Sequence, residues 1–107
     1  MRRASIFLAS LLVATAAMAH KAPSGWSYSG WCCNGTDCAQ IPHEAVKVIE
    51  GGFQITLKPG DHPMVTRVHV FQIEMAKTKQ SQDQFYHVCL WPNEDTLRCV
   101  YVPHMGF

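Results

Sequence analysis

The clearest hydrophobic pattern in this chain is the segment AVKVIEGGFQITL, which spans residues 45–57. Apolar residues lead into Gly51-Gly52 and alternate with polar residues after it, as in strands that bury one face. Two adjacent glycines suit a tight hairpin turn, because both central positions of such a turn need a positive φ angle. The pattern therefore predicts two antiparallel strands, 46–49 and 53–57, joined at the glycines.

Three further strands are predicted towards the C-terminus. Residues 64–71 alternate again between apolar and polar side chains. The segments FYHVCLW (85–91) and LRCVYV (97–102) are runs rich in β-branched and aromatic residues, and the residues PNEDT between them are typical of a loop. The polar stretch 74–84 is predicted to be a loop or one short helix.

The segment before these strands has a different character. Residues 20–41 are rich in glycine, serine, proline and tryptophan and show no periodicity, so we expect an irregular arm. Together these features predict an all-β fold. We expect a small antiparallel sheet or barrel-like domain of about five strands, with a disulfide-tied N-terminal arm packed on it.

The first nineteen residues have the pattern of a secretory signal peptide. Two arginines are followed by an apolar run, and Ala17-Met18-Ala19 supplies small residues where a signal peptidase cleaves. The apolar run is too short to cross a bilayer as a helix, so no membrane anchor is expected after cleavage. Cleavage after Ala19 would remove residues 1–19 and leave one domain, residues 20–107, periplasmic or secreted.

The charge balance excludes one class of partner. The chain has nine lysines and arginines against eight aspartates and glutamates, with a net charge of +1. Removal of the signal peptide takes Arg2 and Arg3 away and leaves seven basic against eight acidic side chains. No run of basic residues remains to neutralise phosphates, so a nucleic-acid partner is not expected.

The chain has five cysteines, and disulfide bonds are expected in a small exported domain. If the last two predicted strands pair around their loop, Cys89 lies opposite Cys99 and His87 lies opposite Tyr101. Directly opposed cysteines on neighbouring strands come within disulfide range. We therefore predict a Cys89–Cys99 disulfide.

The segment GWCCNGTDC holds the other three cysteines, of which only two can bond with each other. The working assignment bonds Cys33 to Cys38 and leaves Cys32 unpaired. A Cys32–Cys38 bridge is an alternative, and a strained bridge between the adjacent Cys32 and Cys33 is a rarer one. A cysteine of the arm could also pair with Cys89 or Cys99, and a leftover thiol could link two chains. The spacing matches no thioredoxin-like motif, haem attachment site or pair of zinc knuckles.

Histidines supply the candidate metal ligands. Cleavage after Ala19 would make His20 the N-terminal residue, whose α-amine and imidazole can chelate one copper ion. His87 and His104 are candidates for a second imidazole, and Met105 adds a thioether beside His104. Copper binding is therefore an alternative function, set against the simpler interpretation that the six histidines are solvated or hydrogen-bonded.

The sequence contains no catalytic motif that we recognise. It lacks nucleophile-elbow, zinc-protease and phosphate-loop patterns, and a small sheet leaves little room for an enclosed cleft. We therefore expect no enzyme, and no cofactor apart from the copper of the alternative interpretation. The predicted function is a structural or interaction module that binds an unknown protein or a second copy of itself through Trp26, Trp31 and Trp91. The simpler interpretation is that these tryptophans only complete a thin core.

The chain contains a series of distinctive elements, which in order are GWCCNGTDC, HPMVT, FYHVCL, Cys99 and VPHMGF. Over nearly the whole mature length this series resembles a family of short exported proteins, mostly alphaproteobacterial, whose function is uncharacterised. Where that family often reads Ser-Pro-Asp-Gly before its His-x-Cys element, this chain has Ser81-Gln82-Asp83-Gln84, without the turn proline and glycine. The resemblance implies export and disulfide bonds, and it carries no activity, cofactor or catalytic residue over.

Overall fold

The computed structural model describes residues 21–104, so the predicted signal peptide and His20 lie outside the described residues. The strands form one sheet of four strands in the order β1-β6-β7-β5 and one of three strands in the order β2-β3-β4. Two short 3₁₀ helices, η2 (His43–Ala45) and η3 (Met75–Lys77), lie between strands. In chain order the strands are β1 (Cys38–Ile41), β2 (Val46–Ile49), β3 (Gly52–Leu57), β4 (His69–Glu74), β5 (Lys79–Gln80), β6 (Tyr86–Leu90) and β7 (Leu97–Val102).

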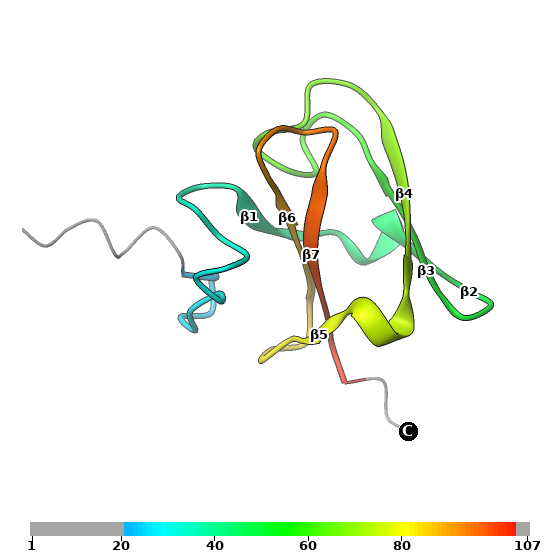
Figure 1. Cartoon of the computed structure of the whole chain (residues 1–107), viewed down its shortest axis with the longest axis horizontal. Coiled ribbons are helices and arrows are strands. Elements are labelled where there is room, and N and C mark those ends of the chain that lie inside the picture. The colour runs from blue at the N-terminus through cyan, green and yellow to red at the C-terminus, as the bar shows by residue number, and fades with distance from the viewer. Residues whose placement is uncertain (1–20, 105–107) are drawn as a thin grey trace, which may run out of the picture.

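The all-β prediction is confirmed, although the strands of the described residues form two sheets instead of one. Figure 1 shows β6 and β7 in the middle of the molecule, with β2, β3 and β4 on one side. The arm, which we define as residues 21–37, lies on the other side. Within residues 21–104, no helix has the length and apolar character that crossing a membrane requires.

The predicted hairpin is confirmed, because β2 pairs antiparallel with β3, but its two-residue turn is Glu50-Gly51 and not Gly51-Gly52, since Ile49 pairs with Gly52. Gly51 has a φ of 80°, a conformation that residues with a side chain rarely adopt. Gly52 is needed for a different reason, since a Cβ atom there would clash with the main-chain oxygen of Ile73 on β4. Gly51 therefore allows the turn, and Gly52, the first residue of β3, lets β4 approach β3.

β4 begins later than the strand predicted at residues 64–71. The residues before it form turns, in which the amide of Val65 donates to the carbonyl oxygen of His62 (3.0 Å). The amide of Thr66 donates to Glu94 in the loop between β6 and β7 (2.8 Å). The residues before β4 therefore do not pair as a strand. The apolar and polar residues alternate there because Val65 is buried at a turn while Thr66 is exposed.

Two short strands were not predicted. β1 lies in the segment that was expected to be irregular, and it pairs antiparallel with β6. β5 lies in the polar stretch that was expected to be a loop or helix, and it pairs parallel with β7. Both strands occupy the edges of the four-stranded sheet, where a few main-chain hydrogen bonds suffice to hold a short segment.

The four-stranded sheet has a separate core on each of its faces. Side chains alternate between the faces along a strand, so Val88 and Val100 point to one side while Cys89 and Cys99 point to the other. The first core packs the valines against Phe53 and its apolar neighbours in the three-stranded sheet. The second core, which contains the cysteines, lies between the sheet and the arm. The four-stranded sheet is therefore the middle layer of three.

Candidate functional site: a cysteine row beneath the arm

Three cysteines form a row across the four-stranded sheet, which we call the cysteine row. Cys38 on β1 lies opposite Cys89 on β6, and Cys89 lies opposite Cys99 on β7. The predicted register of β6 and β7 is therefore confirmed. Opposed residues point to the same face of a sheet, which here is the face that the arm covers. Cys32 and Cys33 belong to the arm and are buried in the same core, so all five cysteines meet in one cluster.

Two disulfides cross this cluster, and they correct the predicted pairing. Cys38 is bonded to Cys89, and Cys32 is bonded to Cys99. The predicted Cys89–Cys99 bond is therefore not formed. The working assignment of a Cys33–Cys38 bridge with Cys32 unpaired is also corrected, because the free cysteine is Cys33. The observed pairing is the alternative in which cysteines from the N-terminal segment bond to β6 and β7.

Main-chain hydrogen bonds explain why Cys89 bonds to Cys38 and not to Cys99. The amide of Leu90 donates to the carbonyl oxygen of Asp37, next to β1 (2.9 Å). Main-chain groups alternate in direction along a strand, so those of Cys89 face β7. Cys38 and Cys89 are then a non-hydrogen-bonded pair, the kind whose side chains lie closer together, and their Cα atoms are 4.0 Å apart.

The observed pairing also restricts the unfolded chain more than the predicted bond would. The two disulfides join residues that are 67 and 51 positions apart, whereas Cys89 and Cys99 are ten positions apart. On the chain-entropy model, a loop of about ten residues contributes about 2.7 kcal/mol and each observed loop about 4 kcal/mol. Each disulfide is therefore a large share of the stability of a small domain.

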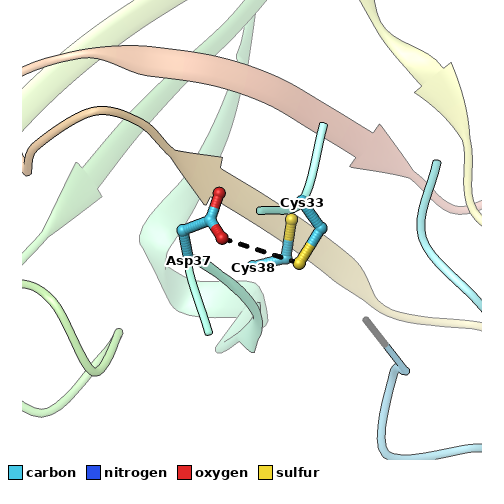
Figure 2. Close-up of side chains that lie close together, drawn as sticks. All are labelled: Cys33, Asp37 and Cys38. Carbon is cyan, nitrogen blue, oxygen red and sulfur yellow. Dashed lines mark hydrogen bonds between the residues drawn. The ribbon is translucent and has the colours of Figure 1, made fainter. Parts of the chain in front are cut away.

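Cys33 carries the only thiol of the cluster, and its side chain is 1% exposed. Its sulfur lies 3.5 Å from the carbonyl oxygen of Gly35 and 3.7 Å from Oδ1 of Asp37. It also lies within 4.8 Å of the Cys38 sulfur, and Figure 2 shows the two sulfurs next to each other. Burial, together with the negative charge of Asp37, raises the pKa of the thiol above its usual value. Cys33 is therefore a buried, protonated thiol beside a disulfide.

Asp37 is the charged neighbour of this thiol, and it is itself only 4% exposed. Its Oδ1 accepts a hydrogen bond from the amide of Asn34 (2.7 Å) and faces the Cys33 sulfur. Its Oδ2 is buried and has no hydrogen-bond partner among the described residues. Burying an unpaired carboxylate oxygen costs stability. Asp37 is therefore a buried, incompletely paired carboxyl group beside the Cys33 thiol.

A hydrogen-bonded relay lies on the same face of the sheet. Nδ1 of His87 is 2.9 Å from the Tyr28 hydroxyl, and its Nε2 is 2.9 Å from Oδ1 of Asp83. An ionised carboxylate only accepts, so Nε2 donates to Asp83. Burial raises the pKa of Tyr28 above its usual value, so the phenol stays neutral. The relay joins the arm to β6 and to the loop before it.

The three tryptophans of the predicted contact surface have different environments. Trp26 is half-buried, and its ring packs edge-on against His87 with centroids 5.0 Å apart. Trp91 is 37% exposed and follows the end of β6, whereas Trp31 is 65% exposed. The Arg98 guanidinium lies 3.8 Å from the centroid of the Trp31 ring, and its Nε donates to the Trp31 carbonyl oxygen (2.8 Å). Trp31 is therefore exposed and yet held in place.

The candidate copper ligands have separate environments. His20 and Met105 lie outside the described residues. His87 is buried and engages both ring nitrogens with protein partners. His104 is exposed at the end of the described segment. A copper site built on His20 therefore stays a prediction, and His87 has no free ring nitrogen to contribute to it.

One group of potential metal ligands lies within the described part of the chain, and it is not the predicted one. The ligand atoms of Cys33, Asp37 and Cys38 all lie within 4.8 Å of one another. Cys38 is bonded to Cys89, so its sulfur is not a thiolate and is a poor ligand. The oxidised chain therefore offers one thiol and one carboxylate here, which do not favour copper.

Sequence reasoning identified the cysteines and His87 but missed the polar groups around them. Tyr28 and Asp37 belong to the segment that was expected to be irregular, and Asp83 to the polar stretch before β6. Only the folded arrangement brings these groups together. One signal was available, because Asp37 is the only acidic or basic residue between Lys21 and the 3₁₀ helix η2 if histidine is counted as neutral. A single charge among small and aromatic residues is unusual enough to mark a special environment.

The described residues establish a small β domain with two disulfides. Comparison of the chain with models of protein families, with curated proteins and with solved structures found no significant match. The resemblance to exported cysteine-containing proteins therefore stays a prediction.

Proposed function

We propose that this protein is an exported interaction module whose arm presents Trp31 to a protein partner. One observation carries the proposal: Trp31 is more exposed than any other large apolar side chain within residues 21–104, and yet it is fixed. Arg98 stacks on its ring and hydrogen-bonds to its main chain. The next residue, Cys32, is bonded to Cys99, so the backbone beneath Trp31 is tied to β7.

The chemistry of this pair supports binding. Tryptophan and arginine are the residue types that most often dominate the energy of protein interfaces. Ordering a flexible side chain on binding costs free energy, and Trp31 and Arg98 already restrain each other. The expected partner surface is an apolar pocket that accepts an indole ring and has a carboxylate at its edge for the guanidinium. We therefore propose that this surface binds a protein partner and catalyses no reaction.

The compartment is part of the same proposal. We infer that the module works in the periplasm or outside the cell, because disulfides persist in oxidising compartments. The predicted cleavage after Ala19 supports this inference. The intact mass of the exported protein should correspond to a chain that begins at His20. A mass that includes residues 1–19 would contradict the proposed processing.

Cross-linking in cells of the native host tests the binding surface. The tagged protein, a Trp31→Ala variant and a Val70→Ala control are compared, because Val70 is also well exposed but lies on β4 in the other sheet. The wild type and the control should capture the same partner protein. Trp31→Ala should weaken that capture about 30-fold, the effect of removing an interface hot spot of about 2 kcal/mol.

Two results would contradict this proposal. Equal capture by Trp31→Ala and the wild type would mean that the surface lies elsewhere. A product of twice the mass of the chain as the main species would identify a second copy, and not a different protein, as the partner. Adding one residue before His20 serves as a further control, since it would abolish copper chelation by the N-terminal amine and leave capture through Trp31 unchanged.

A further inference from the structure

The cluster places a thiol beside a disulfide within one buried site. The Cys33 sulfur lies within 4.8 Å of the Cys38 sulfur, which is bonded to Cys89. Disulfide exchange begins when a thiolate attacks one sulfur of a disulfide. Holding the two reactants side by side replaces a collision between molecules with a step inside one molecule. The geometry therefore favours exchange within the chain, while burial shields the thiol from external disulfides.

Cys89 also has a neighbour on its other side. It lies opposite Cys99 in the pairing of β6 with β7, and Cys99 is bonded to Cys32. A thiolate released at Cys89 would therefore face a second disulfide. Cys32 is adjacent in sequence to Cys33, so the five sulfurs form a continuous series that begins and ends in the arm.

We propose that the cysteine row is an internal thiol–disulfide exchange site, through which the free thiol passes from Cys33 to Cys89. This proposal does not require the proposed binding function. The Cys33 proton goes to hydroxide, and the thiolate attacks the Cys38 sulfur. The Cys33–Cys38 bond forms as the Cys38–Cys89 bond breaks, and Cys89 leaves as a thiolate that takes a proton from water. The number of disulfides is unchanged, so the step needs no oxidant or reductant.

A second step of the same kind continues the series. The Cys89 thiolate attacks the sulfur of Cys99, so that the Cys89–Cys99 bond forms and Cys32 leaves as the new thiol. The resulting bonds, Cys33–Cys38 and Cys89–Cys99, are the pairing that local spacing in the sequence favours. Two exchange steps at this site therefore convert the disulfides of the structure into disulfides between cysteines that are close in the sequence.

The surroundings of Cys33 disfavour its thiolate, so exchange at this site is expected to be slow near neutral pH. Asp37 lies 3.7 Å from the thiol, and its negative charge disfavours the thiolate. The phenols of Tyr28 and Tyr101 are the other titratable groups that interact with the thiol, and burial raises the pKa of each. Burial therefore favours the neutral form of both phenols. Asp37 is the group whose removal should accelerate exchange.

Peptide mapping without reduction tests the proposal on the folded, oxidised protein. Samples are held at a series of pH values, and free thiols are then blocked with N-ethylmaleimide in acidified guanidinium before trypsin digestion. Trypsin separates the cysteines into peptides 22–47, 80–98 and 99–107. In the structure the two disulfides join all three peptides, and the label falls on Cys33.

Each exchange step gives a different map. The first step frees peptide 80–98 from the other two and moves the label to Cys89. The second step joins peptide 80–98 to peptide 99–107 and leaves peptide 22–47 separate, with the label on Cys32. The rate of release should rise about tenfold per pH unit below the pKa of the thiol, since only the thiolate attacks. It should not depend on protein concentration, and Asp37→Asn should increase it several-fold at a given pH.

Two variants make the test decisive. Cys33→Ser should keep all three peptides joined at every pH. Cys89→Ala should form a Cys33–Cys38 bond on oxidation and take up no label. A wild-type label that stays on Cys33 at every pH, or two labels on Cys89→Ala, would overturn the proposal. Random pairing of all five cysteines would also overturn it, because such a mixture comes from the unfolded chain and not from this site.

Discussion

At the scale of single residues, the carboxylate of Asp83 joins the arm to the four-stranded sheet. It accepts hydrogen bonds from the hydroxyl of Ser24, from the indole of Trp26 (2.8 Å) and from the imidazole of His87 (2.9 Å). Burial acts to raise the pKa of this carboxyl, but the hydrogen bonds from Ser24, His87 and Trp26 outweigh it and hold the pKa well below its usual range. The folded state therefore favours the charged form of Asp83.

This preference predicts an acid-dependent loss of stability that Asp83→Asn should reduce. In the unfolded chain Asp83 binds a proton near pH 4, with an ordinary pKa of about 3.9, whereas in the folded protein it stays charged to lower pH. Its stabilising effect is therefore fully present at neutral pH, and it is lost progressively as the pH falls below about 4. Urea unfolding of both proteins between neutral pH and about pH 2, followed by tryptophan fluorescence, measures the difference.

A charge-matched variant away from the arm serves as the control. Glu50→Gln, on the exposed hairpin turn, changes the same amount of charge without touching the arm. Asp83→Asn should be less stable than the wild type at neutral pH, and the two stability curves should converge in acid. Parallel curves for the two proteins would show that the hydrogen bonds to Asp83 have no preference for its charged form.

At the scale of elements, the contact between β3 and β4 depends on a missing side chain. A Cβ atom at Gly52 would meet the main chain of Ile73, which cannot rotate away as a flexible side chain would. Gly51 has open space around it but a φ of 80°. The adjacent glycines therefore have different physical requirements, one for space and the other for backbone conformation.

Alanine substitutions should separate these requirements. Gly51→Ala should cost about 1–2 kcal/mol, the strain of a left-handed conformation. Gly52→Ala should cost more, about 3 kcal/mol or above, because β4 must move away from β3 and loosen the core that contains Phe53. Thermal unfolding of both variants measures the difference. A Gly52→Ala protein as stable as Gly51→Ala would mean that β4 shifts without cost.

The elements that could be predicted from the sequence are those whose signal is local. The β2–β3 hairpin and strand β7 follow from alternation and turn residues within a few positions of each other. β1 could not be predicted, because its four residues, CAQI, show no pattern and become a strand only by pairing with β6. The disulfide pairing depends on that same strand. Once β1 adds to the edge of β6, Cys38 becomes a closer partner for Cys89 than Cys99 is.

At the scale of the whole molecule, one disulfide joins the arm to the middle layer, and the other joins two strands within that layer. Cys32–Cys99 attaches the arm to β7, and Cys38–Cys89 attaches β1 to β6. The core beneath the arm consists mainly of the cysteines and a few aromatic residues, so hydrophobic burial alone provides limited stability there. We infer that the arm stays docked chiefly because it is covalently attached.

Removal of each disulfide in a Cys33→Ser background should test this inference. Replacing Cys32 and Cys99 by serine, or Cys38 and Cys89 by serine, should lower the free energy of unfolding by about 4 kcal/mol. Cys33→Ser itself should change it little, since both disulfides remain. Guanidinium unfolding provides the values. A loss below about 1 kcal/mol on removal of Cys32–Cys99 would mean that the arm stays docked without its covalent bond.

The order of the disulfides along the chain has a consequence for biosynthesis. The bonds are nested, since Cys32–Cys99 encloses Cys38–Cys89. A chain that emerges from its N-terminus exposes Cys32, Cys33 and Cys38 well before Cys89. An oxidant that acts on the emerging chain meets only these three, so every bridge it makes at that stage is non-native. Correct maturation must therefore wait until the final strands have emerged, or must pass through rearrangement of an early bridge.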